Sequence, residues 1–260
     1  MIDRYEHLGR LVTDAISRLE AASPWLVLST TPTRPAQTGS VAAQSDELRR
    51  WVRQQAADWP APIPVGSEPP VIGADKLTFT PPHPPGEAER YFYQFHSDGS
   101  ALGGLQIGAL RDSDGQPVWA LGEGAVAWLV IAMLRVNAAF ARRLSVTGEA
   151  EARVTVVPPA ASGPAVPLEV WNHAGGTYGP AGGHRAGGVD TSRRTVDLAA
   201  CLSSSLPAVA RTLLLDVLGQ FGVTEPRHIG VDGVIRRRHF TGHGARIAAW
   251  AESIGVPSAP

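Results

Sequence analysis

The stretch RYFYQFHSDGSALGGLQIGALR (residues 90–111) decides the fold of this chain. Two strand-like runs flank the pair Asp98-Gly99, and this pattern is among the strongest short-range signals for a β-hairpin. A second turn signal, DSDG at residues 112–115, follows directly, and an apolar helix is expected from about residue 123 to residue 144. Neither the hairpin nor the helix can bury its apolar surface alone. We therefore predict an α+β fold with a mostly antiparallel sheet that is covered by long helices.

Further elements follow from helical or alternating spacing of apolar residues and from capping and turn residues. Helices are expected at residues 3–21, from residue 45, at 206–221 and at 244–254, and strands at 25–29, 152–157, 167–171, 195–198 and, with weak alternation, 234–240. The glycine-rich segment 172–190 is expected to be a loop. Prolines crowd residues 60–70 and 81–85, which favours extended connections. We therefore expect an N-terminal helix and strand region with a proline-rich connection (1–85) and an α+β domain (86–260).

Composition limits the function classes. The 260 residues carry a net charge of -1, which provides no general attraction to nucleic acid or to anionic membranes. The longest apolar run, residues 125–134, is shorter than the roughly 20 residues that span a bilayer, so we expect no membrane association. Cys201 is the only cysteine, which fits a reducing, cytoplasmic location. Lys76, the only lysine, lies in no phosphate-binding or Schiff-base motif.

The segment His96-Ser97-Asp98-Gly99-Ser100 contains the side-chain types of a hydrolytic triad. Neighbouring residues on a strand point to opposite faces, and the chain has no G-x-S-x-G motif. Asp98 and Gly99 are explained more simply as turn formers. We therefore predict no catalytic residue, and keep His96 and Asp98 as candidate binding residues.

The sequence carries only partial signals for a metal or phosphate site. His239 and His243 have a spacing that suits one helical face, but the further ligands that zinc requires are not spaced to join them. The DSDG turn lacks the distant glutamate of a calcium loop. No metal and no cofactor are therefore predicted. Two basic features are candidate binding residues: His184 and Arg185 in the glycine-rich segment, and the run Arg236-Arg237-Arg238, which would bind phosphate if it formed a patch.

Several segments resemble one family. They are SPWLVLS (23–29), FHSDGS (95–100), the helix from residue 122, LLDVLGQFGV (214–223), DGVIRRR (232–238) and WAESIGV (250–256). Together they resemble the C-terminal region of actinobacterial proteins with a Schlafen-type AlbA domain, which is DNA-binding or ATP-binding. The resemblance does not include that N-terminal domain, so it implies none of the domain's activity and no functional residue.

These observations lead to a functional expectation. We expect a non-enzymatic accessory or sensor module of a nucleic-acid-related, Schlafen/AlbA-type system, which acts through contacts with a protein partner. One alternative is a hydrolase or nuclease that uses His96 and Asp98. Another is direct nucleic-acid binding through Arg236, Arg237 and Arg238, which would make binding strongly salt-dependent.

Overall fold

The computed structural model describes residues 4–17, 23–37, 41–57, 69–80, 91–159, 164–174, 176–191 and 193–260. The α-helices in these residues are α1 (Arg4–Ile16), α2 (Ser45–Ala57), α3 (Glu123–Arg143), α4 (Leu206–Gly219) and α5 (Gly244–Ile254). Short 3-10 helices are η1 (Val41–Gln44), η2 (Ala200–Leu202) and η3 (Arg237–His239). The fold class is α+β with mostly antiparallel sheets.

The larger sheet has the strand order β11-β8-β1-β5-β4-β3-β2, with β12 also paired to β8, and its neighbours are antiparallel. Its strands are β1 (Trp25–Pro32), β2 (Val71–Ile72), β3 (Lys76–Phe79), β4 (Tyr91–His96), β5 (Ala101–Gln106), β8 (Glu149–Val157), β11 (Val189–Asp190) and β12 (Arg194–Asp197). β1 lies between β5 and β8, so a single sheet joins the two segments that the sequence analysis separates near residue 86.

The two predicted hairpin turns are confirmed. Gly99 has a φ of 90° in the β4–β5 turn, where the Asp98 carboxylate accepts the backbone N–H of Ser100 at 2.8 Å. In the β6–β7 turn, Asp114 and Gly115 both have positive φ, at 55° and 75°. Two successive positive φ values are typical of the type I′ turn, whose twist matches that of the strands.

A smaller sheet has the order β10-β9-β7-β6. It contains β6 (Ala109–Ser113), β7 (Gln116–Gly122), β9 (Leu168–Ala174) and β10 (Thr177–Ala186). The loop expected at residues 172–190 is wrong, because residues 177–186 form the strand β10. This strand pairs with β9, with a register shift between Pro180 and Arg185. Glycine has low strand propensity, but the backbone of β9 provides the hydrogen-bonding partner that local sequence does not reveal.

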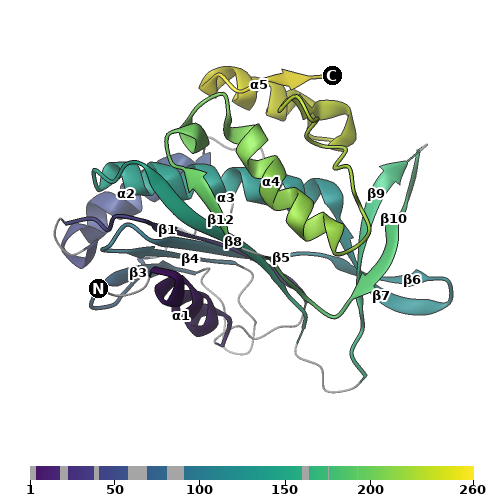
Figure 1. The fold of residues 1–260 in the computed structure, drawn as a ribbon, viewed down its shortest axis with the longest axis horizontal. Coiled ribbons are helices and arrows are strands. Elements are labelled where there is room, and N and C mark those ends of the chain that lie inside the picture. The colour runs from purple at the N-terminus through teal and green to yellow at the C-terminus, as the bar shows by residue number, and fades with distance from the viewer. Residues whose placement is uncertain are drawn as a thin grey trace.

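Helix α3 is the centre of the core. It packs on one face of the large sheet together with α4, while α1 covers the opposite face (Figure 1). By length and composition α3 could cross a membrane, but 83% of its most apolar window is buried inside the protein. A central core helix meets the same criteria. Its predicted extent, about 123 to 144, is confirmed to within a residue.

The C-terminal segment lies over α3 and α4 (Figure 1). The strand expected at residues 234–240 is mostly wrong. Only β13 (Ile235–Arg236) is extended, and it pairs in parallel with β14 (Ser258–Ala259), whereas residues 237–239 form η3. The helix expected at 244–254 is confirmed as α5, which ends at Gly255 with a φ of 70°. Gly255 is the left-handed cap that glycine adopts without strain.

Candidate functional site

A cavity of about 470 Å³ opens beside the first turn of α3. Five separate segments line it: the end of β5 with the following turn, the start of α3, the β9–β10 hairpin, His228, and the stretch from η3 into α5. Most of the lining is apolar or aromatic, and a few polar side chains converge on it. Residues of this kind in a cavity of this size are typical of small-molecule sites.

Parallel pairing places two polar side chains at the same end of the small sheet. β7 and β9 are parallel neighbours, with Gly122 opposite Trp171. Glu123, which follows β7 and begins α3, therefore lies beside Asn172 at the end of β9. The amide of Asn172 donates a hydrogen bond of 2.8 Å to Glu123 Oε2. The carboxylate of Glu123 is fully buried and Asn172 is nearly so.

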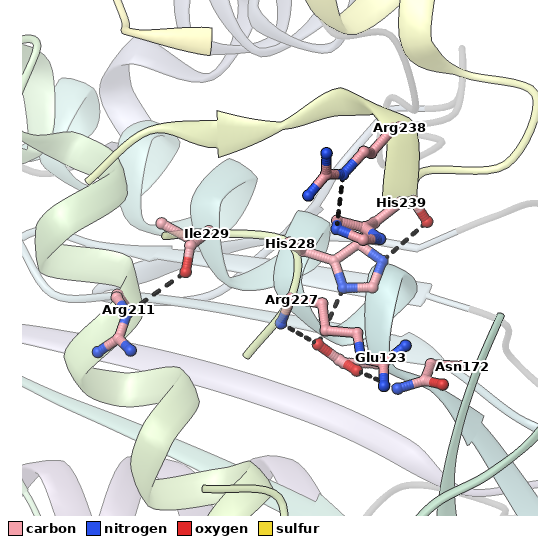
Figure 2. A network of polar contacts seen from close by, with 8 residues as sticks. All are labelled: Glu123, Asn172, Arg211, Arg227, His228, Ile229, Arg238 and His239. Carbon is pink, nitrogen blue, oxygen red and sulfur yellow. Dashed lines mark hydrogen bonds and ion pairs between the residues drawn. The ribbon is translucent and has the colours of Figure 1, made fainter. Parts of the chain in front are cut away.

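Two further contacts complete the environment of Glu123 (Figure 2). Its Oε1 accepts the backbone N–H of Arg227 at 2.6 Å and lies 3.0 Å from Nδ1 of His228. Gly124 makes this approach possible, because a Cβ at that position would lie 2.7 Å from Nε2 of His228. Burial by itself raises the pKa of Glu123, but the hydrogen bonds from His228 and Asn172 outweigh burial, so that its pKa is lowered.

The hydrogen-bond geometry determines where the protons of His228 lie. Its Nε2 is 3.0 Å from the carbonyl oxygen of His239, and a carbonyl can only accept, so Nε2 carries a hydrogen. Another proton lies between Nδ1 and the carboxylate of Glu123. The Glu123–His228 pair is thus neutral as a whole, and both ring nitrogens of His228 are engaged within the protein.

His239 is held differently. Its Nε2 accepts a hydrogen bond of 3.3 Å from Nε of Arg238, so the ring is neutral, with its hydrogen on Nδ1. Burial, followed by the nearby positive charges of His228 and Arg238, lowers the pKa of His239. This half-exposed imidazole therefore stays uncharged at neutral pH at the rim of the cavity.

Aromatic rings form the walls of the cavity. On one side Phe240 packs edge-on against His228 and Trp128, with centroids 4.6 Å and 6.3 Å away. On the other side Tyr178 lies 5.4 Å from Trp171 and 4.8 Å from His173. Burial raises the pKa of Tyr178, so its hydroxyl remains protonated. A planar apolar ligand would find ring faces and edges on both sides.

A second cavity, of about 480 Å³, adjoins the first and shares Asn172 and His239 with it. Its lining is polar and includes the charged residues Arg227, Arg236, Arg238 and Glu225. Arg236 is paired with Asp232, and Arg238 with His239. Arg237 lines neither cavity, and its Nε is buried without a hydrogen-bond partner among the described residues.

The structure does not bring the candidate residues His96 and Asp98 to this site. His96 is buried on β4, on the face that α1 covers, and neither ring nitrogen has a hydrogen-bond partner among the described residues. Asp98 Oδ2 accepts a hydrogen bond from Ser100 at 3.1 Å and lies 2.9 Å from Nε2 of His7, without hydrogen-bond geometry. The Ser100 hydroxyl thus contacts the carboxylate of Asp98 and not the imidazole of His96, so these residues lack the serine–histidine contact of a hydrolytic triad.

The residues His184 and Arg185 also lie outside both cavities. The His184 ring rests against Gly222, and its backbone N–H bonds to Phe221. Arg185 on β10 donates to the carboxylate of Glu169, to Gln116 and to the carbonyl of Ser113, so it links β10 to the other three strands of the small sheet. These contacts give Arg185 a structural role in holding the small sheet together.

Sequence reasoning missed the centre of the site, which is formed by Glu123, Asn172 and His228. One signal was available, since Glu123 is an acidic residue between two glycines at the start of a long apolar helix, where a charge is costly unless it is paired. No group of three or more metal-binding side chains forms a metal-ligand cluster among the residues that the structure describes. Comparisons with protein-family models, curated proteins and solved structures give no match.

Proposed function

We propose that the chain is a non-enzymatic sensor module, in which the apolar cavity beside α3 binds a small aromatic molecule and passes its bound state to a protein partner. The cavity volume of about 470 Å³ suits a ligand of two or three rings. Its aromatic walls favour a planar molecule, and the few polar groups at its rim, such as Tyr178 and His239, would orient it.

The observation that carries the proposal is the closed hydrogen-bond network of Glu123. Its two carboxylate oxygens are engaged by Asn172, Arg227 and His228, and both nitrogens of His228 are engaged as well. A general base needs an open lone pair that reaches its substrate. A buried pair that is already satisfied instead fixes the shape of the cavity, which suits binding rather than catalysis.

The position of the cavity also supports a sensing role. One wall comes from the segment that joins η3 to α5, which supplies Phe240, Thr241 and His243, and from Ile247 on α5. A ligand that touches this wall and α3 together would stabilise the docking of the C-terminal segment on the core. A partner that recognises this segment would then distinguish the bound from the free protein. Such a partner would belong to the cytoplasmic, Schlafen/AlbA-type system that the sequence resemblance implies.

The test is direct binding of a neutral aromatic probe. N-phenyl-1-naphthylamine fluoresces strongly in apolar surroundings, and at about -0.3 kcal/mol per non-hydrogen atom it should bind with a dissociation constant on the order of 0.1 mM. The variant Ala125→Trp adds a large side chain at an exposed position of α3 that lines the cavity, and should abolish the signal. The matched variant Ala249→Trp, exposed on α5 and outside the lining, should keep it. Absence of enhancement with the wild-type protein, or equal enhancement with all three proteins, would refute the proposal.

A further inference from the structure

The polar cavity adjoins the apolar one. Asn172 and His239 belong to the lining of each cavity, so the two spaces meet at the same two residues. Both are of similar volume, about 470 and 480 Å³. The arrangement therefore offers an apolar compartment and a polar compartment in contact with each other.

Positive charge dominates the polar compartment. The lining includes three arginines, Arg227, Arg236 and Arg238, and one acidic residue, Glu225. Asp232 neutralises Arg236 from outside the lining. One positive charge therefore remains in excess when both carboxylates are counted.

Two of these arginines retain donors for a ligand. The side chain of Arg227 forms no hydrogen bond or ion pair with any residue that the structure describes, although its backbone N–H is bound to Glu123. Arg238 uses only its Nε, in the contact with His239, so within the described chain both of its terminal amino groups are unpaired. A guanidinium presents paired donors that match the oxygens of a phosphate group.

We infer that the ligand is an aromatic molecule that carries a phosphate group, with its ring in the apolar cavity and its phosphate between Arg227 and Arg238. This inference rests on the proposed binding function and specifies the chemical class of the ligand. A phosphate requires hydrogen-bond donors and excess positive charge, which the polar cavity supplies. The ring requires apolar walls, which the first cavity supplies. His239, which lines both compartments, is neutral because its pKa is lowered. It can donate its Nδ1–H to the ligand without placing a positive charge next to the ligand's apolar ring.

The experiment compares two probes that differ only in the phosphate. 1-Naphthol and 1-naphthyl phosphate each compete with bound N-phenyl-1-naphthylamine on the intact chain. The phosphate compound should displace the dye at a concentration about tenfold lower than 1-naphthol, because hydrogen bonds to a charged group contribute more than neutral ones. Raised salt should shrink this ratio, since Arg227 and Arg238 are exposed to solvent and their charges are screened. Excess inorganic phosphate should shrink it too, by occupying the polar compartment.

Variants assign the effect to residues. The double variant Arg227→Gln and Arg238→Gln should reduce the tenfold ratio to near one, whereas Arg246→Gln, exposed on α5 and outside both linings, should preserve it. Circular dichroism and thermal unfolding establish that each variant is folded. Equal displacement by the two probes in the wild-type protein would overturn the inference and leave the proposed function standing. A ratio that survives in the double variant would overturn it as well. Failure of the dye itself to bind would instead refute the proposed function.

Discussion

Replacing Glu123 by glutamine should destabilise the protein, because this residue lies at the centre of the buried network. Glutamine has nearly the same volume, and its carbonyl oxygen can still accept the backbone N–H of Arg227. The carboxamide lacks the negative charge that balances the proton shared with His228. Its amino group also faces the amino group of Asn172, unless that side chain turns over. The substitution therefore removes the negative charge of Glu123 and disturbs its hydrogen bonds with His228 and Asn172, with little change in side-chain volume.

The expected magnitude follows from these contacts. A hydrogen bond to a charged group contributes about 1.5–3 kcal/mol. Removing one partner of a buried ion pair costs about 3–5 kcal/mol when the other charge stays uncompensated. In Glu123→Gln, His228 can lose the proton that it shares with Glu123, so no uncompensated charge stays buried. The expected cost therefore lies within the range for a charged hydrogen bond and not in the range for a broken ion pair. We expect Glu123→Gln to reduce the free energy of unfolding by about 2–3 kcal/mol at pH 7.

The assay is unfolding in guanidinium chloride, followed by circular dichroism and tryptophan fluorescence. The exposed Glu252→Gln on α5 is the control and should stay within about 0.5 kcal/mol of the wild type. The pH dependence provides a second test. The pKa of Glu123 is below its usual value of 4.5, so the unfolded chain takes up its proton first as the pH falls. The stability from Glu123 is thus complete above pH 4.5 and is lost as the pH falls through the lower, folded-state pKa.

The difference between wild type and Glu123→Gln should therefore shrink in acid. A Glu123→Gln protein as stable as the Glu252→Gln control at pH 7 would refute the reasoning. So would a difference that grows as the pH falls below 4.5, because it would show that the buried side chain is already protonated in the folded protein.

Three further substitutions test the burial of His96 and the close packing at Gly124. Burial lowers the pKa of His96 from 6.5 to about 4, so the wild type should lose up to about 3 kcal/mol as the pH falls across this window, since only the unfolded chain gains the proton. His96→Phe should flatten that part of the stability profile; an unchanged slope in chemical unfolding would contradict this. Gly124→Ala should destabilise by about 1–3 kcal/mol through its clash with His228, whereas Gly219→Ala on α4, with open space around it, should stabilise slightly. Equal melting temperatures for these two variants would exclude the proposed close approach.

Much of the local structure could be predicted from the sequence. The Asp-Gly turns require positive φ, which few residues other than glycine, asparagine and aspartate adopt, so both hairpins were identifiable. Helix α3 was identifiable from its long apolar run, and α5 from its spacing and its terminal Gly255. Each of these features depends on neighbours within a few residues, which is the range over which sequence patterns act.

The candidate site depended on contacts between distant residues. Glu123 meets Asn172 and His228 across 49 and 105 positions of sequence. The parallel pairing of β7 with β9 brings the first two together, and no local pattern specifies that pairing. By contrast, the arginine run was visible in the sequence, yet its members separate: Arg238 faces the polar cavity while Arg237 does not.

The sequence by itself determined where the chain turns and which stretches are apolar enough to be buried, because backbone conformation and hydrophobicity are properties of a residue and its near neighbours. Tertiary structure alone decided which polar groups meet. A buried carboxylate such as Glu123 is tolerable only when several partners from remote segments converge on it. That convergence is set by the order in which strands pair and by the close approach that Gly124 allows.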